Sequence, residues 1–146
     1  MTRTPDSDPP SRGLEIRYRA YLECLNERVW RELGLHVHEG VIYNGDRVGI
    51  TGYREMLQRD VYEIPDLHFN PGLLVVQPPF VAARLDFLCS PRGRFLGLDV
   101  DGQRIAFTEN VFYHYAHSRI IEVWSVIDKG AVESQLPNRS GREPGA

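Results

Sequence analysis

The spacing of apolar residues changes once along this chain, from a helical period in the first half to a strand period in the second. Between residues 14 and 33, apolar side chains recur at steps of three or four, which predicts an amphipathic helix. A second helix is expected over residues 53–64, with Thr51 as its N-cap. After residue 66, apolar and polar side chains alternate in runs rich in β-branched and aromatic residues. Two helices followed by strands are typical of an α+β domain whose helices cover one face of a sheet.

Short turn sequences divide the second half of the chain into separate expected strands. Connections of this length join antiparallel neighbours, so we expect a meander whose curved sheet can enclose a pocket. A further short strand is expected at residues 35–43, before the favoured tight-turn pair Asn44-Gly45. The strands of the meander are expected over residues 68–77, 80–90, 104–115 and 119–127.

The composition fits one globular domain between two polar tails. The chain has 146 residues, enough to bury a substantial core. Residues 1–12 and 137–146 are rich in Pro, Gly, Ser and charge, which predicts disordered tails around a single domain at residues 13–136. No apolar run has the length of a signal-peptide core or a membrane span, so we expect a cytoplasmic protein with no membrane partner.

Charge and cysteine content argue against several classes of function. The net charge of -3 disfavours a nucleic-acid interface, which needs a clustered excess of Lys and Arg. Cys24 and Cys89 form no Cys-x-x-Cys pair, so neither a disulfide framework nor a zinc site is expected. The His residues also lack ligand spacing, and no metal is predicted.

The end of the last expected strand carries the strongest candidate for acid–base chemistry. In an extended strand Trp124, Val126 and Asp128 share one face, so a carboxylate lies beside a large aromatic residue. A carboxylate in a partly apolar pocket has a raised pKa, which suits a general base. The alternative is that Asp128 caps the short helix that starts at Lys129. Position alone supports the two interpretations equally.

Several short motifs occur in a fixed order over residues 14–136. They are Tyr21-Leu-x-x-Leu25-Asn26, Gly49-Ile-Thr-Gly-Tyr53-Arg54, Pro65-Asp66-Leu67-His68-Phe69, Arg84 in the middle strand, Gly93-Arg-Phe95-Leu-Gly97, and Ile121-Glu-x-Trp124-x-x-x-Asp128 followed by Gln135-Leu136. Together they resemble the motifs of the SnoaL-like polyketide cyclases, a family of the nuclear transport factor 2-like superfamily. The resemblance implies a cone-shaped α+β barrel around a hydrophobic cavity, assembled as a homodimer or higher homo-oligomer. It also implies an intramolecular aldol condensation of a polyketide methyl ester, without a cofactor.

The resemblance assigns roles to residues of the last two strands. In these cyclases an Asp near the end of the last strand acts as acid and base, which corresponds to Asp128 here, with Trp124 as a wall of the pocket. A His on the preceding strand lines the same cavity and corresponds to His114. Because His114 shares strand parity with Asn110 and Phe112, all three are expected on one side of the sheet. A neutral His can donate a hydrogen bond to an enolate; the alternative is a buried His bonded to the backbone.

A second resemblance rests on the middle strand. Arg84 and Asp86 share one face, and with Tyr43 and Asn44 they are similar to the limonene epoxide hydrolase branch of the superfamily, in which two Asp and a bridging Arg activate water. Adjacent strand residues face opposite ways, so Tyr43 and Asn44 fit this pattern poorly. The alternative for Arg84 and Asp86 is an ion pair within the strand.

The SnoaL-like resemblance implies a cofactor-free enzyme that acts on a small hydrophobic carbonyl compound by aldol-type acid–base chemistry. An epoxide hydrolase-like enzyme and a non-catalytic small-molecule-binding protein of the same fold are the alternatives. We expect a homodimer formed through the outer face of the sheet. The predicted catalytic residues are Asp128 and His114, and the predicted substrate-binding residues are Trp124, Asn110, Arg84, Asp86, Tyr43, Tyr21 and Phe112.

Overall fold

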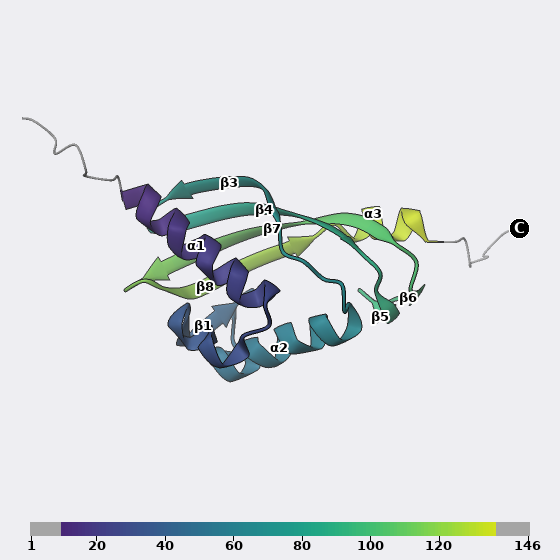
Figure 1. Ribbon diagram of the computed structural model, residues 1–146, viewed down its shortest axis with the longest axis horizontal. Helices are drawn as coiled ribbons and strands as arrows, with labels where there is room; N and C mark the ends of the chain where they lie inside the picture. Colours follow the sequence, from purple (N-terminus) through teal and green to yellow (C-terminus); the bar gives the residue numbers. More distant parts are fainter. Residues whose placement is uncertain (1–9, 137–146) are drawn as a thin grey trace, which may run out of the picture.

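Helices precede the sheet along the chain, as the change in spacing predicts. The computed structural model describes residues 10–136. They form an α+β cone in which a curved, open sheet covers two helices (Figure 1). In chain order the elements are α1 (Pro10–Asn26), η1 (Trp30–Leu35, a 3-10 helix), β1 (Val37–Tyr43), β2 (Asp46–Arg47), α2 (Gly49–Glu63), β3 (Pro71–Gln77), β4 (Phe80–Cys89), β5 (Arg92–Phe95), β6 (Leu98–Asp101), β7 (Ile105–Ala116), β8 (Arg119–Ile127) and α3 (Lys129–Gln135).

The described part of the chain begins with the first helix. Because α1 starts at Pro10, the predicted N-terminal tail of residues 1–12 overlaps the helix by three residues. The rest of both predicted tails, residues 1–9 and 137–146, lies outside the described residues. Among residues 10–136, no helix combines the length and the apolar character that crossing a bilayer demands.

The main sheet has the strand order β2-β1-β8-β7-β4-β3. The predicted antiparallel meander is confirmed, since β3, β4, β7 and β8 are successive antiparallel neighbours. The early strand β1 lies parallel to β8, which was not predicted. No local turn specifies this pairing, because the two strands are separated by most of the chain.

The first helix is shorter than the predicted segment of residues 14–33. α1 ends at Asn26, and Arg28 adopts a left-handed backbone conformation with a φ of 60°. The Arg28 guanidinium donates to the carbonyl oxygen of Leu25 at 2.9 Å, which satisfies an open carbonyl group at the helix end. The apolar period continues beyond the helix because η1 buries Leu33 in the same core.

Helix α2 lies against the inner face of the sheet and buries Tyr53 and Leu57, which are four residues apart. Its N-cap position is Val48, without a side-chain hydrogen bond, so the expectation that Thr51 caps the helix is wrong. Thr51 lies in the first turn instead.

Alternation along the long strands separates a buried inner face from an exposed outer face. On β7, Phe107, Val111 and Tyr113 are buried, whereas Asn110 and Phe112 between them are exposed. Strand β4 shows the same alternation and pairs in register with β7, and β8 pairs with β7 across a register shift between His114 and Tyr115. Helices α1 and α2 therefore cover one face, and the other carries exposed apolar side chains. These are Leu73, Val75, Phe80, Leu88, Phe112, Trp124 and Val126.

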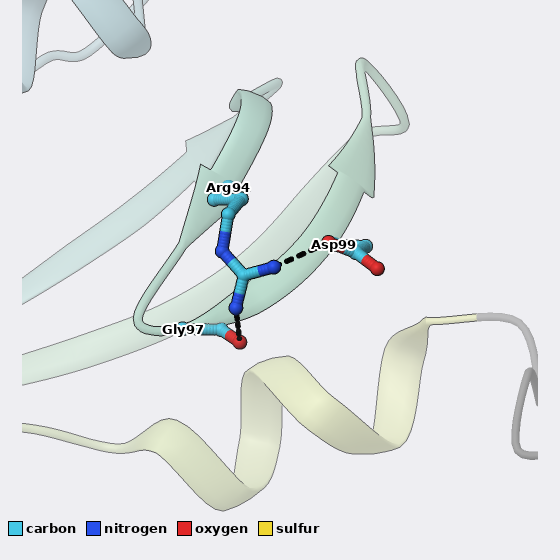
Figure 2. A network of polar contacts seen from close by, with 3 residues as sticks. All are labelled: Arg94, Gly97 and Asp99. Carbon is cyan, nitrogen blue, oxygen red and sulfur yellow. Dashed lines mark hydrogen bonds and ion pairs between the residues drawn. The ribbon is translucent and has the colours of Figure 1, made fainter.

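A small hairpin of β5 and β6 lies beyond the main sheet, near the end of α2 (Figure 1). No strands were predicted there. Arg94 fastens the hairpin, because its guanidinium donates to Asp99 Oδ1 at 2.9 Å and to the Gly97 carbonyl oxygen at 2.6 Å (Figure 2). The ring of Phe95 lies 5.2 Å from that of Phe107, so the hairpin closes one end of the core.

Candidate acid–base site

Two small cavities lie inside the cone, between α2 and the inner face of the sheet. Their volumes are about 40 and 50 Å³, and Asp60, Phe69 and Glu109 line both of them. Tyrosine and aliphatic side chains form most of the remaining wall of the first cavity. Phenylalanine and aliphatic side chains complete the second. The carboxyl groups of Asp60 and Glu109 therefore lie between a cavity lined by tyrosines and a cavity lined by apolar side chains.

Asp60 faces this interior because it continues the buried stripe of α2. Leu57 follows Tyr53 by four residues, and Asp60 follows Leu57 by three, which places all three side chains on one face of the helix. Burial and the charges of Glu109 and Glu63 raise the pKa of Asp60 to about 7. Asp60 can therefore take up and release a proton near neutral pH.

Glu109 reaches the cavities from β7, where it shares the inner face with Phe107 and Val111. Burial raises the pKa of Glu109, while a hydrogen bond from the Ser125 hydroxyl to its Oε2 atom acts in the opposite direction. Because the charge on Glu109 disfavours ionisation of Asp60, the pair favours one protonated and one ionised carboxyl group. That is the arrangement an acid and a base require.

Asn44 positions Ser125 for this contact. Asn44 Oδ1 accepts a hydrogen bond from the Ser125 backbone N–H at 2.8 Å, and Asn44 Nδ2 donates to the Ser125 carbonyl oxygen at 3.2 Å. The predicted turn at Asn44 thus ties the end of β1 to β8. Tyr43, the preceding residue, lines the first cavity and hydrogen-bonds with the Ser125 side chain, while burial raises the pKa of Tyr43.

Three further buried tyrosines, Tyr21, Tyr53 and Tyr113, line the first cavity, and Tyr18 contacts Tyr113 behind them. The hydroxyl oxygens of Tyr21 and Tyr53 lie 2.7 Å apart, and the Tyr18 hydroxyl donates to that of Tyr113 at 3.3 Å. Burial raises the pKa of each of these phenols, so they stay protonated at neutral pH. A protonated phenol can donate a hydrogen bond to an oxygen that becomes negatively charged.

The fold and most of the chain match a known protein family. A model of the SnoaL-like polyketide cyclase family matches residues 15–136. The chain belongs to this family. A crystal structure of a SnoaL-like polyketide cyclase from Agrobacterium tumefaciens is similar, with 45% identity and a TM-score of 0.83 over 85% of this chain and 98% of that one. TsrD from Streptomyces laurentii, at 23% identity and a TM-score of 0.76 over 92% of this chain and 100% of that one, shows the same fold. A search of curated proteins gives no match.

In this SnoaL-like family member, Asp128 lies outside both cavities. Its side chain is exposed, and Oδ1 accepts a hydrogen bond from the backbone N–H of Ala131 at 3.0 Å. Asp128 is therefore the N-cap of α3, which is the alternative that its position in the sequence left open. Its predicted catalytic role has no support from this geometry.

The other predicted side chains of the last two strands share one face, but it is the outer face. Phe112 lies opposite Trp124 across β7 and β8, and Asn110 and His114 have the same parity as Phe112. Trp124 is 39% exposed and Phe112 is 54% exposed, while His114 stacks on Phe80 with 4.7 Å between ring centroids. The expectation that this face lines the pocket is corrected, because alternation alone does not tell which face the helices cover.

Arg84 and Asp86 also lie on the outer face and are exposed. Arg84 Nη1 donates to Asn110 Oδ1 at 3.4 Å, and the Asp86 carboxylate lies over Gly72, where a Cβ atom would collide with it. Neither side chain contributes to the two cavities. The hydrolase alternative requires Arg84 to bridge two carboxyl groups. Arg84 does not bridge the carboxyl groups of the interior.

Tyr21 and Tyr43 are the predicted substrate-binding residues that line the first cavity. Sequence reasoning missed Asp60, Glu109 and Ser125. The sequence contained a signal for Glu109. On β7 it lies on the same face as large apolar residues, where a charged side chain is exceptional. In the described part of the chain, no group of three or more His, Cys, Asp or Glu side chains is arranged to hold a metal ion.

Proposed function

We propose that this chain is a cofactor-free acid–base enzyme that closes a ring in a small hydrophobic carbonyl compound, with Glu109 and Asp60 as its catalytic pair. The observation that supports the proposal is the meeting of two carboxyl groups with raised pKa values between a phenolic and an apolar chamber. Membership of the SnoaL-like polyketide cyclase family supports the same type of substrate.

Glu109 is the better base of the pair. The Ser125 hydroxyl donates to its Oε2 atom and so favours its ionised form. Ionised Glu109 removes a proton from the carbon next to a carbonyl group, and the resulting enolate attacks a second carbonyl group of the same molecule. One carbon–carbon bond forms in this step, and the second carbonyl oxygen becomes an alkoxide.

Asp60 is the matching acid, because a pKa of about 7 leaves a large fraction protonated at neutral pH. It gives its proton to the alkoxide, and the proton held by Glu109 then returns to Asp60. The number of protons balances over the cycle, so the ring closure needs no oxidant or reductant. The hydroxyl groups of Tyr43 and Tyr53 line the same cavity and are suited to donate hydrogen bonds to the enolate oxygen.

A turnover screen with polyketide methyl esters tests the proposal. Glu109→Gln keeps the shape of the side chain but removes the base, so we expect the rate to fall by about 10²- to 10⁴-fold, the usual contribution of general acid–base catalysis. Asp128→Asn is the matched control, since an Asn also caps a helix, and it is expected to keep turnover within about twofold of wild type. Full turnover in Glu109→Gln, or its loss in Asp128→Asn, would contradict the proposed pair.

We also propose that the chain forms a homodimer through the outer face of the sheet. Exposed Phe112, Trp124 and Val126 lie on neighbouring positions of β7 and β8, which supports an apolar contact surface. A contiguous apolar patch of this kind is a usual feature of protein–protein interfaces.

A further inference from the structure

An open groove lies between α1 and the segment that leads into β3. It has a volume of about 490 Å³, and we call it the α1 groove. Its lining includes Arg19 and Glu23 from α1, Glu27 just after the helix, and His68, Phe69 and Pro71 from the other side. The volume falls in the range of small-molecule sites, about 300–1,000 Å³, whereas the two internal cavities of about 40 and 50 Å³ are much smaller.

Phe69 borders all three spaces. It lines the α1 groove and also both internal cavities. Phe69 is only 8% exposed and lies between the groove and the interior. On the inner side, the ring meets Phe87 edge-on, with 5.6 Å between centroids. The carboxyl groups of Asp60 and Glu109 therefore lie behind Phe69 as seen from the groove.

The backbone around Phe69 is held firmly, although this segment belongs to no helix or strand. Asn26 Oδ1 accepts from the Phe69 backbone N–H at 2.7 Å, and Asn26 Nδ2 donates to the Phe69 carbonyl oxygen at 3.0 Å. Arg28 Nη2 donates to the Leu67 carbonyl oxygen at 2.6 Å. With the backbone held in this way, Phe69 can move chiefly by rotation of its side chain.

We propose that Phe69 is the gate between the α1 groove and the acid–base site, and that the groove binds the part of the substrate that the interior is too small to hold. The proposal rests on the proposed function only in its choice of ligand, because the route into the interior can be tested without catalysis. It assigns the substrate two parts, with a reactive carbonyl end inside and a larger portion in the groove, against the apolar side chains of Leu22, Phe69 and Pro71.

A cysteine reporter inside the cavity tests the gate. Val111 lines the first cavity and is buried, and Val111→Cys changes little in volume. Methyl methanethiosulfonate, a small uncharged thiol reagent, is added, and labelling of each cysteine is followed by peptide mass spectrometry. Labelling of Cys24 and Cys89, both buried, reports general opening of the fold.

The matched pair of gate variants is Phe69→Ala and Phe107→Ala. Both remove a phenyl ring from the second cavity, but only Phe69 also borders the groove. In the Val111→Cys background we expect Phe69→Ala to speed labelling at position 111 at least tenfold, and Phe107→Ala to change it less than threefold. Phe69→Leu and Phe107→Leu form a milder pair with the same expected order, if either Ala variant fails to fold.

Glu23→Trp tests whether entry runs through the groove, because Glu23 is exposed on α1 and lines it. Added to the Phe69→Ala reporter, it is expected to slow labelling at position 111 at least fivefold. Equal acceleration by the two Phe variants, or fast labelling that Glu23→Trp leaves unchanged, would overturn the gate. Neither result depends on turnover, so the gate can fail while the Glu109 and Asp60 pair stands, and the reverse also holds.

Discussion

Asp60 shows at the scale of single residues how burial couples acid–base chemistry to stability. Its pKa is raised from 3.8 to about 7 by burial and by neighbouring carboxylates. A group whose folded pKa is raised stabilises the fold below its unfolded pKa, and that stabilisation is lost as pH rises through the folded pKa. Asp60 thus favours folding at pH 4 relative to pH 8.

Asp60→Asn is expected to remove this dependence on pH. The free energy of unfolding of the variant, relative to wild type, should rise by roughly 2 kcal/mol between pH 4 and pH 8. This figure is about half of what 1.36 kcal/mol per pKa unit gives, because Asp60 is only half-buried. Urea unfolding at several pH values measures it, with the exposed Asp46→Asn as control. Parallel pH curves for wild type and Asp60→Asn would show that the carboxyl group is not perturbed.

Single residues also show where prediction from the sequence stops. Strand parity grouped Asn110, Phe112 and His114 on one face, as the structure has them. The face that the helices cover depends on contacts with α1 and α2, which no periodicity within β7 contains. The pattern therefore predicted correctly which residues share a face, but that face was expected to line the pocket. Glu109, on the opposite face, lines the cavity and was overlooked.

At the scale of elements, α3 depends on the residue that precedes it. Asp128 caps the helix, and Val132 within it is fully buried. Gln135 extends the contact, since its Nε2 donates to the Ala106 carbonyl oxygen at 2.5 Å and its Oε1 accepts from the Ala106 N–H at 2.8 Å. α3 is thus tied to β7 at its far end as well.

Asp128→Ala is therefore expected to lower the free energy of unfolding by about 1 kcal/mol, the usual contribution of an N-cap. Asp128→Asn, which keeps an accepting oxygen, should lose only a few tenths. Urea unfolding at pH 7 measures both variants. Equal losses would mean that the Asp128 side chain does not stabilise the start of α3 by capping.

Element boundaries were predictable where a local signal exists. The last strand, residues 119–127, has the predicted ends, because turn residues precede it and Asp128 follows it. The first helix ended earlier than its apolar period, because Arg28 breaks the helix while Leu33 continues the same buried stripe. The β5–β6 hairpin was missed since its short strands depend on contacts such as that of Phe95 with Phe107.

At the scale of the whole molecule, the order of helices and strands predicted an α+β domain, and the resemblance of the ordered motifs implied the cone and the family. The parallel pairing of β1 with β8 could not be predicted, because it joins distant parts of the chain. Assembly also belongs to this scale, since the outer face exposes Phe112, Trp124 and Val126.

Trp124→Glu places a charge at the centre of that face and is expected to weaken homodimerisation at least 100-fold. Sedimentation equilibrium measures the dissociation constant. Leu35→Glu is the control, because Leu35 is an exposed apolar residue of η1 outside the sheet and should leave dimerisation unchanged. A monomeric wild type, or an unaffected Trp124→Glu variant, would exclude this face as the interface.

The central claim is that the acid–base pair lies inside the cone, at Asp60 and Glu109. The most direct test is a carbon-13 NMR titration of the side-chain carboxyl groups, assigned with the Asp60→Asn and Glu109→Gln variants. We predict that Asp60 titrates near pH 7 and that the pKa of Glu109 lies above its usual value, because partial burial disfavours the charged form of both groups. Titration of both groups near pH 4, as in exposed carboxylates, would contradict the claim.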